Sequence, residues 1–231
     1  MQLHKIQGFI HDYLAWLATP EATTNLHYWE TQANWQQHWN LDAPDLRAMY
    51  DRSLTNLTNR RIWKRQAYEP KQMMLTFLAM DPHFVHTMFT DLFNEDKDAH
   101  HRADRFVFYC DELMRQYRLQ YPLTVETGHY HDDGYEMVSL YLAFQYPQLY
   151  APFQAKIQYQ LLKAVGAPNL PATGDFPRHV KVMRTLQTLL LKHPALDEAH
   201  RARLRNQDYQ GDSLLLAFDF AVFVANMSGK P

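Results

Sequence analysis

Histidines and aspartates crowd into one short stretch of this sequence, HYHDDGY, at residues 129–135. Histidine nitrogens and carboxylate oxygens bind zinc and related ions, provided that three or four of them converge on one point. His129 and His131 alternate as they would in a loop or at the edge of a strand, and Asp132 and Asp133 add oxygens. The stretch therefore has two interpretations, a metal site or the beginning of a buried helix.

The metal interpretation itself has two forms. The spacing is similar to the H-x-H-x-D-H run of metallo-β-lactamase-like hydrolases, but Gly134 replaces the last histidine and the chain offers no sheet to hold such a site. The pair His131–Asp132 also resembles the dyad of HD-type phosphohydrolases, which hold metal with an earlier histidine and a later aspartate. Candidates for these additional ligands are His100, His101, Asp175 and Asp197. The HD form stays open as an alternative.

The helix interpretation accounts for more of the residues. Asp132 or Asp133 could accept hydrogen bonds from the first free N–H groups of a helix, where negative charge is also favoured. Apolar residues then recur at helical spacing, namely Met137, Leu140, Tyr141 and Phe144. This interpretation predicts a central apolar helix over residues 134–146 and no bound metal.

A second stretch, NRRIWKRQAYEPK at residues 59–71, is the strongest local concentration of positive charge. Its leading basic residues are Arg60, Arg61, Lys64 and Arg65. Basic side chains contact phosphates, and a neighbouring ring such as that of Trp63 can stack on a base. The alternative is a solvated helix face with Trp63 in the core.

No other motif points to catalysis. DEAH at residues 197–200 matches a helicase motif, but the phosphate-binding G-x-x-x-x-G-K-[ST] loop that must accompany it is missing from the chain. The single cysteine, Cys110, excludes an intramolecular disulfide and a cysteine-based zinc site, and it is expected to be a small buried apolar residue. We therefore predict a protein that is not an enzyme and has no cofactor.

Helical periodicity extends along almost the whole chain. Helices are expected near residues 3–17, 24–39, 44–54, 70–80, 82–93, 106–121, 134–146, 152–165, 176–193, 197–206 and 213–227. Only LTVET, residues 123–127, is typical of a strand, and one strand cannot form a sheet. The pattern predicts an all-α bundle of about nine to eleven helices around the 134–146 helix.

Composition and length agree with a globular protein that has a substantial core. The chain has 231 residues, of which 46% are apolar, and a formal net charge of −2, so no overall positive field attracts nucleic acid. The apolar run 214–225 is too short to span a bilayer, and the N-terminus lacks the pattern of a signal peptide. We expect a cytoplasmic protein with no membrane contact.

The domain organisation depends on the Gly- and Pro-rich joint at residues 166–177. It is either a long loop in one domain, residues 1–231, or the boundary of a smaller helical subdomain at residues 176–231.

Two runs of sequence together resemble the helical region of McrB-type, modification-dependent restriction proteins. They are residues 49–113, from MYDRSLTNLT to HHRADRFVFYCDEL, and residues 129–150, HYHDDGYEMVSLYLAFQYPQLY. The resemblance covers roughly residues 25–195, by inspection of the helices rather than of one short motif. In that family the helical region precedes an AAA+ GTPase module, whose GTP-binding residues have no match here. The resemblance thus implies the N-terminal part of a longer protein.

The function that the resemblance implies is recognition of double-stranded DNA, base-modified or plain, by a non-catalytic module in anti-phage defence. Its partners would be the AAA+ GTPase module and the nuclease subunit of the same system. An alternative is a protein-interaction or assembly module of that system. If a modified base is extruded from the duplex, its pocket would need aromatic walls and a few polar groups, and His129, Tyr130, His131 and Tyr135 could supply them. The alternative is that these side chains pack between helices.

Overall fold

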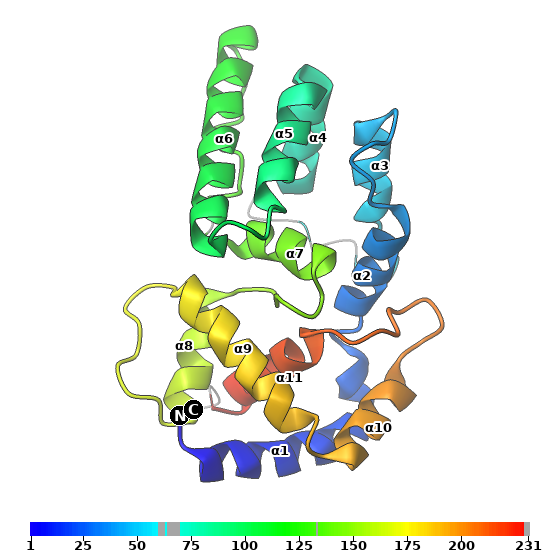
Figure 1. Cartoon of the computed structure of the whole chain (residues 1–231), viewed down its shortest axis with the longest axis vertical. Helices are drawn as coiled ribbons and strands as arrows, with labels where there is room; N and C mark the ends of the chain where they lie inside the picture. Colours follow the sequence, from blue (N-terminus) through cyan, green and yellow to red (C-terminus); the bar gives the residue numbers. More distant parts are fainter. Residues whose placement is uncertain (60–62, 64–69, 133, 229–231) are drawn as a thin grey trace.

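The computed structural model in Figure 1 describes residues 1–59, 63, 70–132 and 134–228, and these residues contain helices and no strand. The helices are α1 (Leu3–Leu17), η1 (Pro20–Thr23), α2 (His27–His38), α3 (Leu46–Ser53), α4 (Pro70–Met80), α5 (Pro82–Leu92), α6 (Ala99–Gln120), α7 (Glu136–Gln145), α8 (Ala155–Ala164), α9 (Phe176–Leu190), α10 (Pro194–Arg203) and α11 (Leu215–Ser228). The predicted all-α class is confirmed.

The helices gather around two large hydrophobic cores, one above the other in Figure 1. Helices α2 to α7 supply most of the upper core, and α1 with α8 to α11 supply most of the lower one. Tyr28 on α2 packs against both cores. The lower core combines the first helix of the chain with the last four, so residues 176–231 do not form a hydrophobic core of their own. The single-domain assignment stays a prediction.

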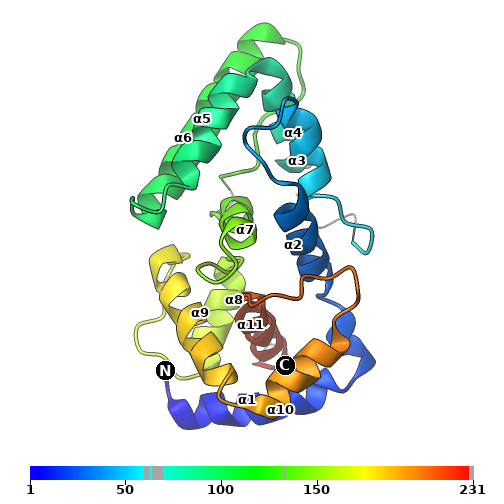
Figure 2. The ribbon, with the colours of Figure 1, turned by 45° about the vertical axis from the view of Figure 1, so that its right-hand side comes forward.

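Helix α7 is the central apolar helix that the sequence predicts. Every residue from Met137 to Phe144 is buried, and the Tyr141 and Phe144 side chains are 0% exposed. Figure 2 shows α7 beneath the two walls of the upper half, one formed by α5 and α6 and the other by α3 and α4. A helix that is apolar on all sides has no face to offer to water, which explains this position.

The start of α7 differs from the prediction. The N-cap of α7 is Tyr135, and the Tyr135 side chain makes no capping hydrogen bond. Asp132 lies three residues before this N-cap, and Asp133 is outside the described residues. Gly134 and Tyr135 have φ angles of 71° and 70°, so a left-handed turn separates Asp132 from the helix. The expected capping by Asp132 is therefore wrong. Asp45, Asp81, Asp98 and Asp175 do cap their helices, each through its side chain.

Among the described residues, no helix combines the length and the apolar character that crossing a membrane requires. Helix α11 is the most apolar, but Asp219 lies within it and accepts hydrogen bonds from Tyr13 and Arg203 at 2.6 and 2.7 Å. This buried group ties α11 to α1 and α10.

Candidate functional site

The outer end of α6 and the segment that returns from it enclose a cavity of about 420 Å³. Figure 1 shows α6 reaching the top of the molecule, from where residues 121–132 return toward α7. Both polar and apolar residues line this cavity, among them Asp111, Arg115, Arg118, Leu119, His129 and Asp132. We call this cavity the outer pocket.

Two arginines on α6 shape the outer pocket. Arg115 forms two hydrogen bonds with Glu112, at 2.7 and 3.0 Å, and these bonds hold the pKa of the Glu112 carboxyl at about 2. Arg118 donates a hydrogen bond to the main-chain carbonyl of Thr127, which fastens the returning segment to the helix. Arg115 is thus neutralised by its neighbour, and Arg118 has a structural contact.

Large apolar side chains are exposed beside the outer pocket. Leu119 is 71% exposed, Tyr121 47%, Leu123 97% and Val125 88%. The last three alternate along residues 121–127, and residues 124–129 have no regular secondary structure. The N–H groups of Leu123 and Val125 have no hydrogen-bond partner among the described residues. The strand-like LTVET sequence is therefore present without a neighbouring strand, and we call residues 121–127 the exposed segment.

Below the pocket, His129 and His131 form a buried hydrogen-bonded network. His129 is 2% exposed, and its Nε2 lies 3.1 Å from a carboxylate oxygen of Asp111. His131 is 0% exposed, and its Nε2 lies 3.0 Å from the Tyr141 hydroxyl, which is itself 2.7 Å from the Tyr50 hydroxyl. Burial, aided by the neighbouring His129, lowers the pKa of His131 to about 3, so its imidazole is neutral.

Backbone strain concentrates in the same segment. In the described residues only three non-glycine residues have a positive φ, namely Tyr130 at 61°, Tyr135 at 70° and Asn169 at 53°. Left-handed backbone is costly for a residue with a side chain and persists only where the surroundings hold it. Two of the three therefore mark residues 129–135 as a segment whose conformation is held by other contacts.

Three of the described residues proposed from the sequence for nucleic-acid binding are buried, namely Trp63, His129 and His131. Trp63 is 4% exposed and donates a hydrogen bond to the carbonyl of Leu54 at 3.0 Å, so its ring belongs to the upper core and does not offer a face for stacking. His131 is equally inaccessible. Arg60, Arg61, Lys64 and Arg65 lie outside the described residues.

Tyr135 is partly buried and is held by other side chains. Its hydroxyl donates to the Asp104 carboxylate, and its ring lies 5.6 Å from His100 and 5.7 Å from Phe176, centroid to centroid. Burial and the Asp104 carboxylate raise the pKa of Tyr135 to about 12. Of the four residues of the proposed base pocket, only His129 lines the outer pocket, and His131 is fully buried.

The metal set of the HD interpretation is not assembled either. In the part of the chain that the structure describes, the ligand atoms of His131 do not converge with those of His100, His101, Asp175 or Asp197. The group it does join consists of Cys110, His129 and His131. The sequence analysis did not predict that Cys110 joins His129 and His131, because the cysteine lies on α6 and the two histidines lie on the segment that follows it. The H-x-H stretch at residues 129–131, which follows the helix that carries Cys110, could have indicated this group.

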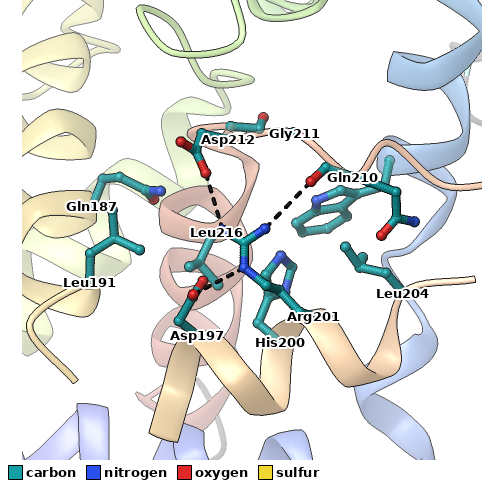
Figure 3. Close-up of a pocket in the computed structure, with 12 residues that line it drawn as sticks. Gln187, Leu191, Asp197, His200, Arg201, Leu204, Gln210, Gly211, Asp212 and Leu216 are labelled. Atoms are coloured by element: carbon teal, nitrogen blue, oxygen red, sulfur yellow. Dashed lines mark hydrogen bonds and ion pairs between the residues drawn. The ribbon is translucent and has the colours of Figure 1, made fainter. Parts of the chain in front are cut away.

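A second cavity, of about 20 Å³, lies in the lower half between α9, α10 and α11 (Figure 3). Arg201 at its centre pairs with Asp197 at 3.0 Å and Asp212 at 3.2 Å, and it also reaches the carbonyl of Gln210. The charge of Arg201 is neutralised within the protein, and the volume of the cavity is about that of one water molecule. We therefore do not assign a ligand to this cavity.

Comparison of this chain with family models, with curated proteins and with solved structures finds no match. The resemblance to McrB-type proteins accordingly stays a prediction, as does every function that it implies.

Proposed function

We propose that this chain is a protein-interaction module, which binds an extended segment of a partner protein along the exposed segment, residues 121–127. One observation carries the proposal: Leu123 and Val125 are 97% and 88% exposed, and their N–H groups have no partner among the described residues. The chemistry required of the partner is an extended stretch with apolar side chains at alternate positions.

Strand addition fits both properties of the exposed segment. An incoming strand supplies main-chain hydrogen bonds, and its side chains cover the exposed residues on alternate positions. Residues with strand propensity, such as Leu123 and Val125 in LTVET, favour this pairing. Complete burial of a leucine or valine side chain contributes about 1.5–3 kcal/mol, so covering these two favours binding.

The exposed segment is already held in one conformation at both ends. At its start, the Tyr121 ring lies 5.0 Å from Tyr117, and the Thr124 hydroxyl donates to the Tyr117 hydroxyl at 3.3 Å. At its end, Arg118 binds the carbonyl of Thr127. A binding segment that is ordered beforehand loses less conformational entropy when its partner arrives.

The first partners to test are the proteins that the resemblance implies, an AAA+ GTPase module and a nuclease subunit. A photo-crosslinking amino acid is placed at Leu123 and, as the control, at Leu57, which is 75% exposed in another part of the molecule. In the native host we expect a discrete protein adduct at position 123 and none at position 57. Absence of an adduct at 123, or the same adduct at both positions, would contradict the proposal.

Substitution then tests the contact itself. Leu123→Ser combined with Val125→Pro removes one apolar side chain and one N–H donor from residues that contribute little to the folded core. We expect the crosslinked complex to weaken at least tenfold while the melting temperature stays within a few degrees of that of the unmodified protein. Leu57→Ser, the control, should leave the complex unchanged.

Recognition of modified DNA has less support, because Trp63 and His131 are buried. It rests on the resemblance and on the basic residues Arg60, Arg61, Lys64 and Arg65. If those residues bind phosphates, affinity for a duplex falls steeply with salt, and reversal of all four charges flattens that slope.

A further inference from the structure

Three buried side chains with metal-binding atoms meet beneath the outer pocket. Cys110 lies on α6, and His129 and His131 lie on the returning segment, and one ligand atom of each is within 4.8 Å of the other two. The three side chains are 0%, 2% and 0% exposed. Within the described ranges, this is the one group of three such residues that converges in this way.

We propose that Cys110, His129 and His131 bind a divalent ion of the zinc class, through the cysteine thiolate and one nitrogen of each imidazole. Zinc ligands lie about 2.0–2.3 Å from the metal, which places them roughly 3.3–3.8 Å from one another in a tetrahedron. Atoms already within 4.8 Å reach that arrangement with movements of about 1 Å. One thiolate and two imidazoles suit zinc or cobalt better than magnesium or calcium.

The hydrogen bonds leave each imidazole neutral, with one lone pair. His129 Nδ1 accepts from the N–H of His131 at 3.1 Å, so its proton is on Nε2, which donates to Asp111. His131 Nδ1 lies 2.7 Å from the carbonyl of His129 and must donate to it, which leaves the lone pair on Nε2. A carboxylate that accepts from a ligating histidine is the usual support of a metal site, and Asp111 has that position.

One of the two hydrogen bonds that a metal would displace has a replacement nearby. Tyr141 now donates toward His131 Nε2, but its hydroxyl also contacts that of Tyr50 at 2.7 Å, so it keeps a partner when the imidazole turns to a metal. The bond from the His131 N–H to His129 is the one that is lost. Its geometry, 3.1 Å on a backbone next to the strained Tyr130, makes it one of the weaker bonds of the network.

Charge around the thiol favours a cation. The carboxylates of Asp111 and Asp132 interact electrostatically with the Cys110 thiol. The same negative charges attract a divalent ion, and the ion in turn stabilises the thiolate, whose proton leaves to solvent. A water from the outer pocket, which His129 lines, would complete the coordination.

The consequence for the fold is a clamp between α6 and the returning segment. The ion would hold residues 129–131 against Cys110 and so fix the segment that carries the strained Tyr130. This proposal departs from two predictions made from the sequence, namely that the chain holds no metal and that its single cysteine excludes a cysteine-based zinc site. It does not depend on the proposed docking function, because the ligands are buried and the exposed segment contributes none of them.

The test uses the full chain without a histidine tag. Protein isolated from zinc-supplemented cells and dialysed is expected to retain about one ion per chain by mass spectrometry. Replacement by cobalt should give a thiolate-to-cobalt charge-transfer band in the near ultraviolet, and a chelator should lower the melting temperature. Cys110→Ala is expected to lose the ion, the band and the effect of the chelator. His83→Ala, an exposed histidine on α5, should keep all three.

Two results would overturn the proposal. One is a folded, unmodified protein, verified by circular dichroism, that retains no ion and gives no charge-transfer band with cobalt. The cluster would then be a hydrogen-bonded part of the core. The other is an ion that remains bound in Cys110→Ala, which would place it at a different site. The cobalt band of the unmodified protein decides the matter even if the variant does not fold.

Discussion

Arg201 and Arg203 stand two residues apart on α10 and both pair with aspartates, yet water reaches only one of these pairs. The Arg203 and Asp219 side chains are 5% and 1% exposed, and Tyr13 and Asn25 also bind Asp219. Arg201 and Asp212 are 49% and 67% exposed and line the small cavity in Figure 3. A buried charge that loses its partner is costly, whereas an exposed one is solvated.

The two aspartates give a matched pair of substitutions. Asp219→Ala leaves the guanidinium of Arg203 buried without its counter-charge, and we expect the free energy of unfolding to fall by about 3–5 kcal/mol. Asp212→Ala should change it by less than about 1 kcal/mol. Urea denaturation of both variants measures the difference. Equal losses would mean that burial does not control the strength of these pairs.

His179 makes the stability dependent on pH. Its ring is 1% exposed, and burial lowers its pKa to about 4, while an unfolded chain has the ordinary value near 6.5. Below about pH 6.5 the unfolded chain binds a proton on this imidazole, whereas the folded protein keeps the imidazole neutral down to about pH 4. Stability is therefore greatest above about pH 6.5 and falls as the pH decreases toward 4, by at most about 1.4 kcal/mol per pH unit for this group.

His179→Phe removes this group, so its free energy of unfolding should fall less between pH 7 and pH 5 than that of the unmodified protein. Urea denaturation at the two pH values measures the change. A His83→Phe variant, altered at an exposed position, should keep the original dependence. The same dependence in all three proteins would show that other groups cause it.

At the scale of elements, the turn before α7 is what separates the histidine segment from the central helix. Gly134 has a φ of 71°, and no atom lies within 4 Å of the position that a Cβ would occupy there. Strain, and not crowding, therefore decides what a side chain would cost at this turn. Gly8 lies in the exposed interior of α1 and has the same free space without the unusual φ.

One substitution should thus have opposite effects at these two glycines. Gly134→Ala forces a side chain into left-handed backbone, and we expect a loss of stability of about 1–2 kcal/mol. Gly8→Ala reduces the freedom of the unfolded chain and suits a helix, so it should gain about 0.4–1 kcal/mol. Thermal unfolding measures both. A gain at Gly134 would mean that the turn is not strained.

For the whole molecule, the two cores make the ends of the chain depend on each other. Ile6, Ile10 and Tyr13 of α1 pack in the same core as α9, α10 and α11. Cutting the chain at residue 175 separates these helices, and either fragment then exposes the apolar surface that the other covers.

We therefore expect neither residues 1–175 nor residues 176–231 to unfold cooperatively when expressed separately, in contrast to the full chain. Circular dichroism during thermal denaturation measures this. An equimolar mixture of the fragments should regain part of the transition. A sharp transition in the isolated 176–231 fragment would instead support the separate subdomain considered from the sequence.

Much of the fold is a local property and was predictable for that reason. Spacing of apolar residues along 3–17, 70–80 and 134–146 depends only on neighbours in the chain, and α1, α4 and α7 lie where it places them. The central position of α7 follows too, because a helix with apolar residues on all faces must be surrounded.

The tertiary structure decided what these residues can do. Whether Trp63 faces solvent and whether Cys110 meets two histidines depend on segments that are distant in the chain. Hydrogen-bond partners and burial arise only when α6, α7 and the returning segment pack together. The sequence by itself determined the helices and the central one among them. Packing determined which of the candidate residues are buried, because burial depends on what each helix meets and not on its own pattern.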